Sequence, residues 1–314
     1  LFVLPRPAEV PAPIAADEGA SASTEASAGR IAITDVRLFD GESVIDNAVV
    51  VIEGGRVIAA GRQITTPIPD GAERIDGSGQ TALPGLIDAH VHAFGGAQRD
   101  AARFGVTTLL DMFRPPEDFE QTHAQRESRE PVDGADLYSA GFLATAEGGH
   151  GTQYGIDVPI PAGPGDAQAW VDARLAEGSD WIKIVVETGQ GWGSEIPSLD
   201  AETVRALVEA AHARDVLAMA HVGSLAEAEL AVDAGVDGLV HLWGDREVDA
   251  ETAAAWAERG LFIVPTTPVL AGAYGQPGVE RLERFEAVET FLTPDQERSL
   301  GGSFPNSAAR AEQW

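Results

Sequence analysis

Short apolar runs alternate with longer amphipathic stretches along most of this chain, from Leu86 onward. Apolar runs such as residues 181–187 have the length of strands that are buried on both faces. The amphipathic stretches predict helices over residues 167–177, 201–214, 225–234 and 251–259. Strands that alternate with helices are typical of repeated βα units, so the pattern predicts an α/β protein with a parallel sheet.

The pattern before Leu86 differs, because short strands follow one another there without helices. Residues 31–38, 48–52 and 56–60 predict three strands, and residues 53–56 predict a hairpin turn. Residues 30–84 are therefore expected to form a small N-terminal β-sheet.

Residues 1–29 are rich in Ala, Pro, Ser and Glu and cannot form a core of their own. We expect a flexible, low-complexity segment. Its first five residues resemble the remnant of an export signal, which predicts a periplasmic or secreted protein. A cytoplasmic location is the alternative.

Composition limits the partners of the protein. The 314-residue chain has a formal net charge of -29, which disfavours nucleic acids and anionic lipids, because both are bound by basic surfaces. Its length suits a barrel of about 250 residues with an appended piece. There is no apolar run of about 18 residues, so no membrane span is expected. The absence of cysteine excludes disulfides and thiolate metal ligands.

Four of the seven histidines lie at the ends of apolar runs that are expected to be buried strands. His90 and His92 are two residues apart, so the period of a strand places both imidazoles on one face. His221 and His241 each end another apolar run. A single histidine in such a place is most often a hydrogen-bonded core residue. Four of them indicate a metal site, because imidazole suits zinc-like ions.

Lys183 is the only lysine of the chain, and it lies within the apolar run 181–187. A lysine at the end of a strand usually extends its amine to solvent. A buried amine, unlike a guanidinium, loses its proton readily and becomes nucleophilic. It can then capture carbon dioxide and form a carbamate, which is an oxygen ligand for metal ions. The unique lysine, together with the four histidines, favours this second role.

In their order along the chain, these residues resemble the metal-dependent amidohydrolase superfamily, in particular the branch of imidazolonepropionase-like enzymes and of Xaa-Arg, Xaa-Lys and Xaa-Pro dipeptidases. The resemblance spans roughly residues 31–310. The matching motifs are Pro-Gly-Leu-Ile-Asp-Ala-His-Val-His at 84–92, Gly-Val-Thr-Thr at 105–108, Gly-Gly-His-Gly at 148–151, Trp-Ile-Lys-Ile at 181–184, Ala-His at 220–221 and Val-His at 240–241.

The resemblance implies a TIM-type (β/α)8 barrel over residues 85–314, with its chemistry at the C-terminal ends of the strands. It also implies a binuclear centre of two divalent metal ions, expected to be zinc. The implied ligands are His90 and His92 on the first strand, carboxylated Lys183 on the fourth, His221 on the fifth and His241 on the sixth. The N-terminal sheet would form half of a β-sandwich.

One part of the family pattern is missing from this sequence. The pattern ends with an aspartate on the eighth strand, the expected general base, and no such strand is found up to Trp314. Asp295 fits a helix start better, and residues 306–314 read as a helix that leads into the missing strand. We expect the strand and its aspartate beyond residue 314 or from a second chain. The alternative is a non-catalytic barrel fragment or subunit. A homo-oligomer is also expected.

The resemblance implies hydrolysis of an amide, peptide or cyclic amide C–N bond in a small-molecule substrate, with a dipeptide or an N-acyl amino acid favoured. The metal ions would lower the pKa of the attacking water and polarise the scissile carbonyl. Candidate substrate-binding residues are His150 and Tyr154, in a glycine-rich loop, and Arg114, whose guanidinium suits a carboxylate. Hydrolases of lactones, carbamates and phosphotriesters use the same metals and are the alternatives.

Overall fold

The computed structural model describes residues 29–128, 132–273, 292–294 and 296. Contacts divide the chain into two compact units. One ends at Gly85, and the other contains Leu86–Glu127 and the chain from Asp133 onward. None of the helices in the described ranges combines the length and the apolar character that a bilayer crossing requires.

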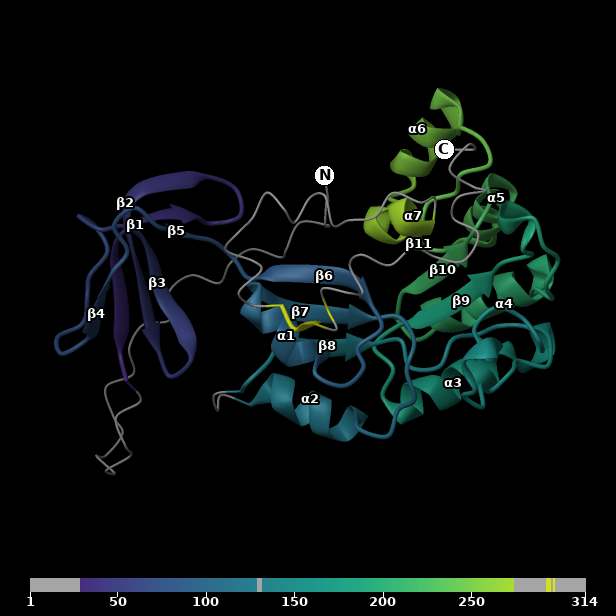
Figure 1. Cartoon of the computed structure of the whole chain (residues 1–314), viewed down its shortest axis with the longest axis horizontal. Helices are drawn as coiled ribbons and strands as arrows, with labels where there is room; N and C mark the ends of the chain where they lie inside the picture. Colours follow the sequence, from purple (N-terminus) through teal and green to yellow (C-terminus); the bar gives the residue numbers. More distant parts are fainter. Residues whose placement is uncertain (1–28, 129–131, 274–291, 295, 297–314) are drawn as a thin grey trace. The chain divides into compact units, whose positions relative to one another are not determined.

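The N-terminal unit is a small sheet of β1 (Ile31–Phe39), β2 (Val44–Glu53), β3 (Arg56–Arg62), β4 (Glu73–Asp76) and β5 (Thr81–Ala82) (Figure 1). β1, β2 and β3 are antiparallel neighbours, and β4 and β5 pair with β1 in parallel. The β2–β3 turn places Gly54 and Gly55 at φ values of 56° and 74°, in the left-handed region that favours glycine. The predicted hairpin is confirmed, and its place in a β-sandwich stays a prediction.

The second unit repeats strand and helix along the chain, as the apolar pattern predicts (Figure 1). Its strands are β6 (Leu86–Val91), β7 (Val106–Asp111), β8 (Asp136–Ser139), β9 (Ile182–Val186), β10 (Ala218–Val222), β11 (Gly238–Val240) and β12 (Phe262–Val264). Its helices are α1 (Ala97–Arg103), α2 (Phe119–Glu127), α3 (Ala167–Glu177), α4 (Ala201–His212), α5 (Leu225–Ala234), α6 (Ala250–Glu258) and α7 (Thr267–Ala273). Side chains of Asp200, Ser224 and Asp249 cap the N-termini of α4, α5 and α6.

The strands of this unit are parallel and follow one another in chain order. One sheet has the order β6-β7-β8, and the other has the order β9-β10-β11-β12. The segment after β8 joins them, because Ala144 donates its N–H to Lys183 and accepts one from Val185. Within the described residues β6 and β12 each have a single strand neighbour, so no closed barrel is formed there. The predicted eighth strand, Asp295 and the helix predicted over residues 306–314 lie outside the described residues.

Successive side chains of β9 point to opposite faces of the sheet, one covered by helices and the other facing a cavity. Ile182, Ile184 and Val186 pack in the main apolar cluster with side chains of α3, α4 and α5. Lys183 and Val185 face the other way, into a cavity. Lys183 is the second residue of β9 and only 3% exposed. Its expected place at the C-terminal end of the strand is therefore wrong, and it lies deeper than the histidines.

Candidate active site

One cavity on the inner side of the parallel strands gathers most of the residues singled out in the sequence. It is lined by His90, His92, Met112, Phe113, Leu143, His150, Tyr154, Lys183, Val185, His221 and His241. The five candidate metal ligands are all in this set. Chain segments that are up to 151 residues apart, from His90 to His241, thus meet because parallel strands in chain order bring their inner faces together.

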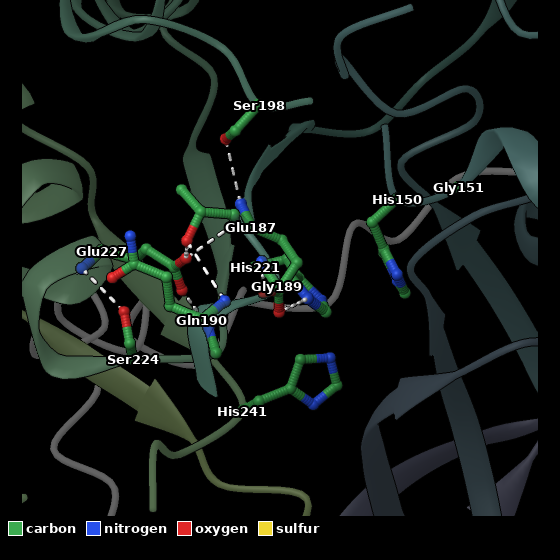
Figure 2. Close-up of polar contacts among 12 residues, drawn as sticks. His150, Gly151, Glu187, Gly189, Gln190, Ser198, His221, Ser224, Glu227 and His241 are labelled. Carbon is green, nitrogen blue, oxygen red and sulfur yellow. Dashed lines mark hydrogen bonds and ion pairs between the residues drawn. The ribbon is translucent and has the colours of Figure 1, made fainter. Parts of the chain in front are cut away.

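The histidine rings lie close to one another in the cavity. The ring centres of His90, in β6, and His92, directly after it, are 5.5 Å apart. The ring of His241 lies 4.6 Å from that of His90 and 4.6 Å from that of His221. Figure 2 shows the rings of His150, His221 and His241 around one space.

His241 reaches the cavity through an unusual backbone conformation. Val240, the residue before it, already packs in the inner apolar cluster, so simple alternation would turn His241 outward. His241 instead has a φ of 78°, a left-handed conformation that is rare for a residue with a side chain. Its Nδ1 lies 2.6 Å from the hydroxyl of Thr266, which is itself left-handed at a φ of 46°. Such local strain is often retained at functional sites.

Burial favours the uncharged forms of the histidine rings and of the Lys183 amine, whose nitrogen atoms can then give an electron pair to a metal ion or another electrophile. Desolvation lowers the pKa of His90, His92, His221 and His241 below 6.5, so the rings are neutral at pH 7. Desolvation also lowers the pKa of the Lys183 amine to about 7, partly offset by the charge of Asp111. A large fraction of the amine is therefore unprotonated and nucleophilic at neutral pH.

The donor set fits a metal centre by its chemistry. Neutral imidazoles are ligands for zinc-like ions, and Nδ1 of His90 is buried without a hydrogen-bond partner in the described structure. In the described ranges, no group of three or more His, Asp and Glu side chains is arranged as a finished metal site. The cavity thus supplies suitable ligands but not their final coordination geometry.

Two of the three candidate substrate-binding residues line the same cavity. His150 stacks on His221 with ring centres 4.4 Å apart, and burial lowers its pKa. Tyr154, in a short 3-10 helix (Thr152–Tyr154), is 57% exposed at the cavity wall. Arg114 is not brought into the cavity, because its guanidinium pairs with Asp118 at 2.5 Å. The predicted contact of Arg114 with a substrate carboxylate has no support from this placement.

The sequence interpretation missed two buried carboxyl groups at the ends of strands. Asp111, at the end of β7, accepts hydrogen bonds from the N–H groups of Ala93 at 2.7 Å and Phe113 at 2.8 Å. Burial raises its pKa to about 6. Glu187 directly follows β9 and contacts His221. The available signal was an acidic residue at the end of an apolar run, which occurs in both cases.

Comparison with known proteins finds related sequences and structures for this chain. The sequence model of the amidohydrolase family matches residues 81–284. The imidazolonepropionase of Streptomyces coelicolor is 26% identical over 247 residues, which cover 66% of this chain and 60% of that protein. The chain thus spans less than two thirds of the length of this curated relative.

Solved structures show the same fold. A putative prolidase from Bifidobacterium longum matches 91% of this chain and 72% of its own, with a TM-score of 0.64 and 23% identity. A Xaa-Pro dipeptidase with bound methionine matches 91% of this chain and 77% of its own, with a TM-score of 0.63 and 23% identity. At this identity the likeness is one of fold, and that fold is of the TIM-barrel type.

Proposed function

The chain belongs to the amidohydrolase family, and from this premise we propose that its second unit carries the metal-dependent active site of a hydrolase that cleaves amide C–N bonds. The observation that carries the proposal is the cavity that the only lysine of the chain lines together with four histidines whose pKa values are lowered by burial. The proposed metal ligands are His90, His92, Lys183, His221 and His241.

In this proposal Lys183 is carboxylated. Its neutral amine attacks the carbon of carbon dioxide, so that an N–C bond forms, one C–O π pair moves to oxygen and a proton passes from the nitrogen to water. The product carries one negative charge shared by two oxygens in place of a neutral amine, in a cavity whose other ligand atoms belong to neutral imidazoles. Two divalent ions, proposed to be zinc, would supply a Lewis acid for the scissile carbonyl and activate water when they are bound.

The cavity residues that are not proposed metal ligands suit the binding of an amide substrate. Phe113, Leu143 and Val185 belong to one apolar cluster and line the cavity, so they can exclude water from the reacting bond. His150 is neutral, lies against His221 and can donate one hydrogen bond to a substrate carbonyl. The names of the relatives, a prolidase and a Xaa-Pro dipeptidase among them, support a dipeptide or an N-acyl amino acid as the substrate class.

A substrate screen tests the proposed function. Dipeptides, N-acyl amino acids and cyclic amides are offered to the protein with added zinc, cobalt or manganese, and the metal content of the purified protein is measured. We expect about two ions per chain and hydrolysis of at least one amide that stops when a chelator removes the metal. Turnover of lactones or phosphotriesters alone would contradict the amide assignment, and a protein without bound metal would contradict the metal centre.

Substitution of His150 by alanine is expected to lower turnover of such an amide by about 100-fold, the usual effect of removing one positioned donor. The bound metal content should stay unchanged, because His150 is not one of the proposed ligands. His212→Ala is the matched control, since that imidazole is 44% exposed and bonds Asp237 outside the cavity. Loss of metal in the His150 variant would instead make His150 a ligand.

A further inference from the structure

Glu187 lies beside the ring of His221. It follows β9 at a position that continues the inward face of Lys183 and Val185, and it is only 1% exposed. Its Oε2 lies 3.3 Å from Nε2 of His221, and its Oε1 accepts the N–H of Gly189 at 2.7 Å (Figure 2). Each carboxyl oxygen thus faces a different nitrogen atom.

This pairing determines which nitrogen of His221 carries the proton. A carboxylate only accepts hydrogen bonds, so the Nε2 that faces it must be the N–H of the neutral ring. The lone pair is then on Nδ1. We propose that Glu187 is the positioning residue of His221, which holds the ring in the Nε2–H tautomer and leaves Nδ1 free as a ligand. The proposal rests on the proposed function, because it assigns the nitrogen with which His221 would bind metal.

The carboxyl group packs closely against Gly223. A Cβ on Gly223 would come within 2.2 Å of Oε2 of Glu187, so only glycine leaves room for the carboxyl at this point. The backbone N–H of Glu187 also donates to the hydroxyl of Ser198 at 3.2 Å. The side chain and the main chain of Glu187 are therefore both hydrogen-bonded, to Gly189 and to Ser198, as a positioning role requires.

Glu227 provides a matched control in the same region. It is 4% exposed, and its carboxyl accepts hydrogen bonds from Thr188 N at 2.7 Å, Thr188 Oγ1 at 2.6 Å and Gly223 N at 2.8 Å. It thus links the loops after β9 and β10 through backbone and hydroxyl groups. A Glu227→Gln variant therefore shows how the loss of a buried carboxylate affects these loops when that carboxylate has no hydrogen bond to the imidazole of His221.

Glu187→Gln gives a sharp test, because an amide has one acceptor and one donor end. With its oxygen kept on the N–H of Gly189, its NH2 group faces Nε2 of His221 and forces the ring proton to Nδ1. We expect nitrogen NMR of the metal-free full chain to report the Nε2–H tautomer of His221 in the wild type and the Nδ1–H tautomer in the variant. Zinc affinity should fall by about 10- to 100-fold, while Glu227→Gln keeps the wild-type tautomer and affinity.

The proposal is overturned if Glu187→Gln keeps the wild-type tautomer, whatever its zinc affinity, or if Glu227→Gln changes the tautomer equally. A wild type that binds no zinc would contradict the proposed function, and the tautomer would still decide the role of Glu187. If Glu187→Gln does not fold, Gly223→Ala replaces it, because the added methyl group displaces the carboxyl and leaves its charge in place. A tautomer shift in that variant supports the proposal, and an unchanged His221 spectrum contradicts it.

Discussion

Replacement of Lys183 by arginine is expected to abolish metal loading and to lower amide hydrolysis by about 1,000-fold or more. A guanidinium keeps its charge when buried and cannot form a carbamate, so the site would hold a cation where the proposal requires an anion. Loss of metal removes several kcal/mol of transition-state stabilisation, and about 4 kcal/mol corresponds to that factor. Metal analysis and steady-state kinetics on one preparation measure both effects.

Lys183→Ala shows whether activity is lost because the carbamate is missing or because the protein no longer folds. The shortened side chain leaves space at a position that is 3% exposed, and a small carboxylic acid such as propionate can occupy it. We expect added propionate to restore part of the metal content and activity in this variant and none in Lys183→Arg. Full activity of Lys183→Arg without any additive would show that the amine is not the source of a metal ligand.

Metal-free protein in buffer without carbon dioxide is expected to become more stable as the pH rises from about 7 to about 10.5. Burial lowers the pKa of Lys183 from 10.5 to about 7 in the folded state. Between these values the unfolded chain binds the proton and the folded chain does not, so the free energy of unfolding increases with pH. Each pKa unit corresponds to about 1.4 kcal/mol, which limits the gain to about 5 kcal/mol.

Lys183→Met isolates this contribution, because the methionine side chain is similar in length and has no titrating group. Urea denaturation of both proteins at several pH values gives the difference in the free energy of unfolding. We expect the variant to be more stable than the wild type at pH 7 and the difference to shrink as the pH approaches 10.5. A difference that stays constant over this range would contradict the buried, deprotonated amine.

The metal-binding candidates could be predicted because their residue types are rare and their positions periodic. A single lysine and seven histidines stand out in a chain of 314 residues, and strand periodicity orients His90 and His92 correctly. The carboxyl groups of Asp111 and Glu187 could not be singled out in this way. They belong to 50 acidic residues, and only the three-dimensional structure shows that they are buried.

Local backbone conformation is a second feature of the site that could not be predicted from the sequence. His241 reaches the cavity through a positive φ, which no pattern of apolar residues encodes. Helices α3 and α5 have the predicted bounds, α4 ends two residues earlier than predicted, and α6 both begins and ends one residue earlier. Helix α1 was not predicted from the pattern because none of its residues is buried, so it has no clear apolar stripe.

The two faces of strand β9 are subject to different packing constraints. Ile182, Ile184 and Val186 are constrained by the helices that pack on them, whereas Val185 lines the cavity. A change at Val185 can therefore alter the shape of the cavity without repacking the helices. Substitutions at such inward positions are expected to change the shape of the cavity, while the outward positions preserve the packing of the helices on the sheet.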